Sequence, residues 1–447
     1  MKIWHPWHWL LALVLLVGCG QTAAVSQVDT GQNADTQSLD TAVDIADAGL
    51  VDAVPTDATA TDSALPDSVL PDGVLADIAD TAADTSLPED ASAVDAETGP
   101  DVTYPIGTTS VWIHYPGKGP ITLRGDKEPL SWQVDSAPVQ ILPDVSIFTL
   151  PEKGGQWQVK PLLAGAWSIG PNYVVTAGQQ RHIYAYFDKK LAMPRREDFA
   201  VTMDDGSQRM VRVRLPAGYD ENTTANYPWI LMLDGQNLYL DSESSMGQSW
   251  KLGEAIDASM VAGKLTEFIV VGVDHGGDKR IAEYTPWPDP KEGGGLGQAH
   301  LTWIETKVVP KIVSKYRVSA DLPLIGGSSL GALMSLYAAA AHPQIWRGAV
   351  AMSGAWWWDA LQITAWLPTS PGVKNPFAVW LDAGDQNDGL ADTQGLRDLL
   401  LSFGWELDGN LGYYEAKNAN HSEASWSVRV HLPLEFFFNP GDRAPAF

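Results

Sequence analysis

Short apolar runs recur through the second half of the chain and limit its fold more than any other feature. They consist mostly of Val, Ile and Leu, and most are separated by segments long enough for a helix, such as 301–316, 332–341 and 393–403. Such runs are typical of parallel strands that are covered on both faces by helical crossovers. We therefore predict an α/β fold over residues 195–447, with a mainly parallel sheet flanked by helices. The runs are 210–215, 229–233, 268–273, 322–325, 348–352, 377–381 and 412–416.

One serine stands between the fourth run and the helical segment that follows it. The sequence Gly327-Ser328-Ser329-Leu330-Gly331 fits the G-x-S-x-G pattern of a sharp strand-to-helix turn. Side chains at 327 and 331 would collide with such a turn, and the helix N-terminus adds partial positive charge beside the serine. The pattern predicts that Ser329 is a nucleophile. Ser328 has the wrong spacing, and the alternative is a glycine-rich turn without chemistry.

A nucleophile of this kind needs a histidine later in the chain. Three histidines follow Ser329, namely His342, His421 and His431. His342 ends the helix after the turn, and His431 falls in the final helical segment. His421 lies in a polar loop after the last apolar run, so we expect it at the carboxyl edge of the sheet. We predict that His421 is the base.

The acid of such a triad should follow the run 377–381. The segment after this run offers Asp382, Asp385 and Asp388. Asp382 is expected to lie too close to the strand to reach the histidine. We predict Asp388 as the acid and keep Asp385 as the alternative. The histidines of the chain lack the spacing of metal ligands, so neither a metal nor a cofactor is expected.

Several segments together resemble the putative-esterase family of α/β-hydrolases, which includes esterase D, enterochelin esterases and feruloyl esterases. The resemblance covers about 200–447. It implies that Ser329 is the nucleophile, that His421 is the general base, and that backbone amides near Gln236 and at Leu330 form an oxyanion hole. The segments are 213–219, 233–238, 271–280, 283–287, the serine turn, and His421 with Trp426.

The chain departs from the pattern of this family at two positions. The family commonly has Asp or Glu at the fourth position of Gly-x-x-Asp/Glu, but this chain has Asn387 there and Asp388 one residue later. The choice between Asp385 and Asp388 therefore stays open. The family often has Asn where this chain has His275, so no catalytic role is assigned to His275.

Tryptophans cluster near the expected carboxyl edge of the sheet. Trp356 and Trp357 follow the run 348–352, and Trp287 belongs to one of the family-like segments. Aromatic side chains suit an acyl group or the C–H face of a sugar. We predict that Trp287, Trp356 and Trp357 bind substrate, with a lid or packing cluster as the alternative.

Residues 103–190 show short alternating stretches separated by Gly, Pro and Asp turns. This pattern predicts a small all-β sandwich, either immunoglobulin-like or carbohydrate-binding-like. The segment that begins at Arg124 resembles β-sandwich modules that precede bacterial esterase domains. Trp132, Trp157 and Trp167 are candidates for a sugar-stacking platform or for the core.

Acidic residues dominate the preceding segment. Residues 20–103 hold eighteen Asp and Glu and no Lys or Arg, and so account for most of the net charge of −26. Such a segment cannot bury enough apolar surface to fold. We expect 19–102 to be a disordered, extended tether. Because no basic stripe is present, nucleic acid is not an expected partner.

The N-terminus has the pattern of an export signal. Lys2 precedes the apolar run 9–17, which is too short to span a bilayer comfortably. The single cysteine, Cys19, follows at a position that resembles the lipobox of bacterial lipoproteins, in which the cysteine is acylated. We expect residues 1–18 to be a lipoprotein signal peptide, and Gly20 favours the outer membrane. The alternative is an ordinary secreted protein.

These features together predict a membrane-anchored, extracytoplasmic serine esterase with a Ser-His-Asp triad. Its expected substrate is a polysaccharide acyl or feruloyl ester, or a siderophore ester. Two alternatives stay open, namely an acyltransferase that uses the same triad and a glycan-binding surface lipoprotein without catalysis. The oligomeric state is not predicted.

Overall fold

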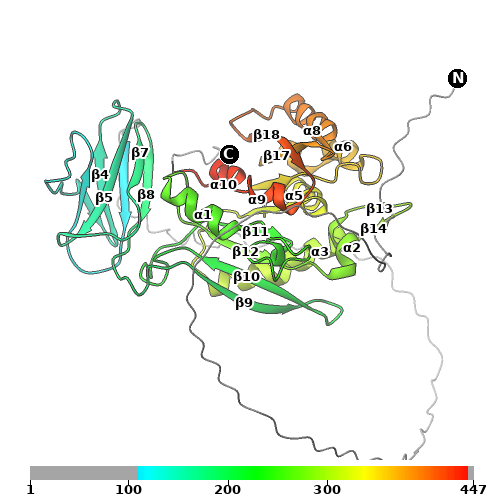
Figure 1. The fold of residues 1–447 in the computed structure, drawn as a ribbon, viewed down its shortest axis with the longest axis horizontal. Helices are drawn as coiled ribbons and strands as arrows, with labels where there is room; N and C mark the ends of the chain where they lie inside the picture. The colour runs from blue at the N-terminus through cyan, green and yellow to red at the C-terminus, as the bar shows by residue number, and fades with distance from the viewer. Residues whose placement is uncertain (1–108, 441–447) are drawn as a thin grey trace, which may run out of the picture. The chain divides into compact units, whose positions relative to one another are not determined.

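One eight-stranded sheet organises the C-terminal part of the chain in the computed structural model, which describes residues 109–440. Most neighbouring strands pair in parallel, and the last two pairings are antiparallel. The predicted signal peptide, with Cys19, and the predicted tether lie outside the described residues. The order across the sheet is β18 (Leu411–Asn420), β17 (Ala378–Gln386), β16 (Gly348–Met352), β15 (Leu324–Ser328), β11 (Trp229–Leu233), β12 (Ile269–Val273), β10 (Gln208–Leu215) and β9 (Arg195–Thr202). Figure 1 shows β17 and β18 at one edge of the sheet and β9 and β10 at the other.

The central strands are buried at every position, because helices cover both faces of the sheet. Alternate residues of β11 belong to two different cores: Leu231 packs with α5 (Leu330–Ala341) and α8 (Leu390–Ser402), and Ile230 packs with α1 (Leu252–Val261) and α10 (His431–Phe437). This arrangement confirms the predicted α/β fold with its mainly parallel sheet. The remaining helices and the small hairpin are η1 (Gly235–Asn237), η2 (Gly277–Lys279), α2 (Arg280–Tyr284), β13 (Pro288–Asp289), β14 (Gly293–Gly294), α3 (Gly297–Trp303), η3 (Ile304–Val308), α4 (Val309–Lys315), α6 (Gln362–Trp366), η4 (Leu367–Thr369), α7 (Pro371–Lys374) and α9 (Glu423–Ser427).

Two details differ from the sequence prediction. The helix expected over 301–316 contains the π-helical segment η3, which separates α3 from α4. Strand β17 continues past the apolar run to Gln386, so Asp382 and Asp385 lie in the strand and not in a loop. Polar residues extend the strand because β18 pairs with it almost to its end.

Two smaller sheets precede the large one and share a core of their own. Trp157 is part of this core, whereas Trp167 is 43% exposed and its ring lies 6.1 Å from that of Trp132. Trp157 is therefore no part of an exposed platform. The first sheet is β3 (Gln140–Leu142), β4 (Val145–Leu150), β1 (Thr109–His114) and β8 (Gln180–Tyr184); the second is β2 (Ile121–Gly125), β5 (Gln156–Leu163) and β6 (Ala166–Trp167), with β7 (Tyr173–Thr176) beside β5. Within residues 109–440, no helix is both long and apolar enough to span a bilayer.

A buried histidine in α3 makes the stability of the fold sensitive to acid. His300 is 3% exposed and stacks on Trp303 at 5.5 Å, and neither of its ring nitrogens has a hydrogen-bond partner within the described residues. Burial lowers the pKa of His300 to about 3, and the charge of Arg209 contributes in the same direction. In the unfolded chain the pKa is about 6.5, so below that pH the unfolded state binds one more proton. Stability is therefore lost as the pH falls from about 6.5 toward 3.

Replacing His300 with phenylalanine should remove this loss. Between pH 8 and pH 5 the wild-type free energy of unfolding should fall by about 2 kcal/mol more than that of His300→Phe. Urea unfolding of both proteins at the two pH values measures this difference. Equal losses in the two proteins would show that His300 does not titrate on unfolding.

Candidate active site

Ser329 occupies a strained turn between β15 and α5. Its backbone angles are φ 57° and ψ −122°, which a non-glycine residue adopts only when its surroundings impose them. A Cβ added to Gly327 would lie 2.9 Å from the carbonyl carbon of Gly331, so the turn requires glycine at 327. The physical reason predicted for this glycine therefore holds in the structure.

Three predicted side chains form one hydrogen-bonded row. The Oγ atom of Ser329 lies 2.9 Å from Nε2 of His421, and Nδ1 of His421 lies 2.6 Å from Oδ1 of Asp388. His421 directly follows β18, and Asp388 comes shortly after the neighbouring parallel strand β17. Both strands end at the edge of the sheet where β15 leads into the serine turn, and this topology brings the row together. The Asp388 carboxylate is fully buried, whereas 39% of the His421 side chain is exposed.

The other two carboxylates of this segment face different partners. Asp385 accepts hydrogen bonds from the backbone N–H of Asn418 and from the side chain of Gln386. Asp382 is buried and contacts Arg429. The structure therefore places Asp388, and not the alternative Asp385, against the imidazole.

A short loop after β11 lies opposite the serine turn. Asp234, at its start, has a φ of 58° and accepts two hydrogen bonds of 2.7 Å from Arg280, and its own N–H donates to Tyr284. A Cβ added to Gly331 would lie 3.3 Å from Oδ2 of Asp234, so this loop is close to the serine turn. Within residues 109–440, no hydrogen bond is donated by the backbone N–H of Gln236.

The backbone N–H of Leu330, like that of Gln236, has no described hydrogen-bond acceptor. It belongs to the first residue of α5 and donates no hydrogen bond to any described residue. The first amides of a helix have no intrahelical acceptor, so they can donate to a ligand. The amides of Gln236 and Leu330, which the family resemblance implies for the oxyanion hole, therefore both lack an acceptor among the described residues.

The three tryptophans predicted to bind substrate have different surroundings. Trp356 is fully buried and its indole donates to Thr393, so the prediction for Trp356 is wrong: its ring belongs to the core under α8. Trp287 is half-buried, with its ring edge-to-face against Tyr337. Trp357 is 52% exposed. Only Trp287 and Trp357 stay candidates for substrate contact.

Two further histidines contact other groups. Nδ1 of His342 lies 2.8 Å from the carboxylate of Glu305. Nε2 of His275 lies 2.9 Å from the hydroxyl of Ser245, and its Nδ1 accepts a hydrogen bond from Gly277. Burial lowers the pKa of His275. In the part of the chain that the structure describes, no three His, Cys, Asp or Glu residues are grouped as metal ligands.

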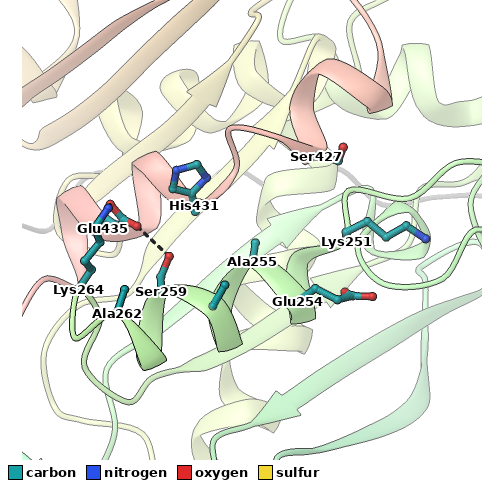
Figure 2. Close-up of a pocket in the computed structure, with 10 residues that line it drawn as sticks. Lys251, Glu254, Ala255, Ser259, Ala262, Lys264, Ser427, His431 and Glu435 are labelled. Carbon is teal, nitrogen blue, oxygen red and sulfur yellow. Dashed lines mark hydrogen bonds and ion pairs between the residues drawn. The ribbon is translucent and has the colours of Figure 1, made fainter. Parts of the chain in front are cut away.

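His431 lines a separate surface pocket. This pocket has a volume of about 460 Å³ and lies between α1 and the C-terminal helices α9 and α10 (Figure 2). Ser259 of α1 donates across it to Glu435 of α10 at 2.8 Å. Ser329, His421 and Asp388 are absent from its lining, so the pocket is not part of the hydrogen-bonded row.

Sequence reasoning missed two side chains that contact Asp388. Ser353 directly follows β16, and its hydroxyl donates to Oδ2 of Asp388 at 2.6 Å. Nη2 of Arg429 lies 3.4 Å from the same oxygen. The positive φ of Ser353, 47°, has no sequence signal, but the lone charge of Arg429 between Val428 and Val430, eight residues after His421, was a usable one.

The fold and the strained serine turn define an α/β-hydrolase. Residues 203–432, about half of the chain, match the family model described as "Putative esterase". The chain therefore belongs to the putative esterase family.

Similar proteins include enzymes of known structure and one relative without an assigned role. The uncharacterized protein YbbA of Bacillus subtilis (strain 168) is 24% identical over 178 residues, which is 38% of this chain and 66% of the relative. The chain thus spans just under two thirds of the length of this curated relative. A ferulic acid esterase structure is 19% identical with a TM-score of 0.42, and the match covers 55% of this chain and 98% of that one. The enterobactin esterase FES from Shigella flexneri is 13% identical with a TM-score of 0.44, and the match covers 73% of this chain and 92% of that one.

Proposed function

We propose that this protein hydrolyses carboxylic esters through a triad of Ser329, His421 and Asp388. The observation that carries the proposal is the unbroken row of hydrogen bonds, 2.9 Å and 2.6 Å long, that ends on a serine in a strained turn. His421 takes the Oγ proton of Ser329 as the oxygen attacks the ester carbonyl. Asp388 orients the imidazole and stabilises the imidazolium. His421 then protonates the leaving alcohol, and water releases the acyl group by the reverse sequence.

The unpaired amides of Gln236 and Leu330 are proposed to form the oxyanion hole. Leu330 directly follows Ser329 as the first residue of α5, and Gln236 lies in η1, two residues after Asp234; neither backbone N–H has a partner within the described residues. Donors that are already oriented need no rearrangement when negative charge develops on the carbonyl oxygen. Loss of one such donor typically lowers kcat by about 10²- to 10³-fold.

The substrate is proposed to be a polysaccharide acyl or feruloyl ester, or a siderophore ester. The exposed indole of Trp357 and the half-buried Trp287 are proposed to contact its aromatic or sugar part. The His421 side chain is 39% exposed, so water can reach it. Access of water favours hydrolysis over acyl transfer.

A substrate panel tests this function. The purified protein is assayed first with p-nitrophenyl acetate and butyrate, and then with feruloyl, acetyl-xylan and siderophore esters. We expect hydrolysis of the p-nitrophenyl esters and a clear preference within the second group. Added sugars or alcohols should leave the yield of free acid unchanged. Acylated sugar as the main product would indicate an acyltransferase, and binding of glycan without turnover would overturn the proposal.

The protein is also proposed to be anchored to the outer membrane through acylated Cys19. A lipid-modified N-terminal residue holds a protein at a membrane, with about 0.8 kcal/mol per buried methylene group. Cys19→Ser should therefore move the protein from the detergent phase to the aqueous phase in a Triton X-114 partition of cells that express the full chain. Equal partitioning of the wild type and Cys19→Ser would contradict anchoring at this residue.

A further inference from the structure

A buried cluster of polar side chains lies beside Asp388, and two of its members, Ser353 and Arg429, contact the second carboxylate oxygen. It consists of Asp382 in β17, Ser353 after β16 and Arg429 after α9. The Arg429 side chain is 3% exposed and both carboxylates are fully buried. Arg429 donates from Nε to Asp382 at 2.9 Å and from Nη2 to the Ser353 hydroxyl at 2.5 Å. Three separate segments of the chain thus converge on Asp388.

The direction of the Ser353 hydroxyl follows from its partners. Its oxygen lies 2.9 Å from Nε1 of Trp426 and 2.5 Å from Nη2 of Arg429. Indole and guanidinium nitrogens only donate, so both bonds use the lone pairs of the serine oxygen. The hydroxyl hydrogen is therefore left for Oδ2 of Asp388, 2.6 Å away.

This arrangement selects the tautomer of His421. Oδ2 of Asp388 also accepts a hydrogen bond of 2.5 Å from the backbone N–H of Gly384. With Oδ2 occupied, Oδ1 accepts from Nδ1–H of His421 at 2.6 Å. The proton of a neutral imidazole then lies on Nδ1, and Nε2 presents its lone pair to Ser329.

The cluster also sets the buried charge beside the imidazole. Two ionised carboxylates and one guanidinium carry a net charge of −1, which a protonated His421 would neutralise. Burial raises the pKa of Asp382, and Arg429 opposes this rise. Arg429 contacts both Asp382 and Asp388 on the side of Asp388 that faces away from His421. Among the described residues, it is the one cation there.

We propose that Arg429 is a positioning residue for the esterase reaction, which acts through Ser353 and Asp388 and holds the buried charge beside His421 at −1. The inference rests on the proposed function of the triad. The titratable groups in contact with Arg429 are Asp382 and Asp388. His421 faces Asp388 and Ser329, and Glu423 follows it in the chain and interacts electrostatically with Arg280.

The acid limb of the kcat/KM profile reports the pKa of the free-enzyme base and so tests this inference. We would measure hydrolysis of p-nitrophenyl acetate from pH 4.5 to 9 for the full chain and for Arg429→Lys, Arg429→Gln and Asp382→Asn/Arg429→Gln. Glutamine keeps an N–H donor and removes the charge, whereas lysine keeps the charge. Without the cation the imidazolium is more stable, so the limb of Arg429→Gln should move up by about 1 pH unit. The limbs of Arg429→Lys and of the double variant should stay at the wild-type position.

A purely structural role would lower the melting temperature and the amount of active enzyme without moving the limb. An unmoved limb in folded Arg429→Gln, or equal movement in all three variants, would overturn the inference. If Arg429→Gln does not fold, Asp382→Asn serves instead. It removes a negative charge from the cluster, which destabilises the imidazolium, so its acid limb should move to lower pH. Activity that persists in Ser329→Ala would overturn the proposed function itself. Activity that depends on Ser329, combined with an unmoved limb, overturns only the role of Arg429.

Discussion

Replacing His421 with alanine is expected to lower kcat for p-nitrophenyl acetate by about 10⁵- to 10⁶-fold. The imidazole is the only described group within hydrogen-bond distance of the Ser329 side chain, at 2.9 Å. Without it the hydroxyl has no base, and the leaving alcohol has no acid. Binding and the oxyanion donors persist, so some rate above that of water should remain.

His431→Ala is the matched control for this prediction. His431 is the last histidine of the chain and lies in the separate pocket between α1 and α10. Its replacement should change kcat by less than about twofold, because it contacts none of the reacting groups. A large loss in His431→Ala, or a small loss in folded His421→Ala, would contradict the assigned base.

Replacing Asp388 with asparagine is expected to lower kcat by about 10⁴-fold. The backbone N–H of Gly384, which faces Oδ2, can only donate, so the amide oxygen of the new side chain must take the place of Oδ2. The amide NH₂ must then face His421 and donate to Nδ1. The imidazole proton moves to Nε2, which can no longer accept the proton of Ser329. The loss should therefore appear in kcat with little change in KM.

Asp385→Asn separates this effect from a general loss of charge near the site. Asp385 precedes Asp388 by three residues in the sequence, and its described hydrogen-bond donors are Asn418 and Gln386. We expect its activity to stay within about twofold of the wild type. Steady-state kinetics of the two variants, with circular dichroism as a check on folding, gives the comparison. A loss in Asp385→Asn that equals the loss in Asp388→Asn would contradict the assignment of the acid.

The fold was predictable because its signal is local and repeated. Each central strand contains a short apolar run, and glycines mark the turn at Ser329. The serine and the histidine follow from their places after strands at one edge of the sheet. Strand β9 gave no such signal, because Val201 is its only buried residue and it contains four charged residues.

The contacts that orient the site were beyond sequence reasoning for a physical reason. Ser353, Asp388 and Arg429 lie in three different segments, and only the packing of β16, β17 and α9 brings them together. The burial of Trp356 is equally non-local, since it depends on Thr393 of α8. When tryptophans are adjacent in the sequence, the sequence alone does not show which indole ring is buried in the core.

The central claim is that Ser329 is the nucleophile, and covalent labelling tests it most directly. The full chain would be treated with a fluorophosphonate and digested, and the modified residue located by mass spectrometry. Wild type and Ser328→Ala should carry one label on Ser329, and Ser329→Ala should carry none. A folded wild-type protein without label, a label on another residue, or undiminished labelling of Ser329→Ala would contradict the account.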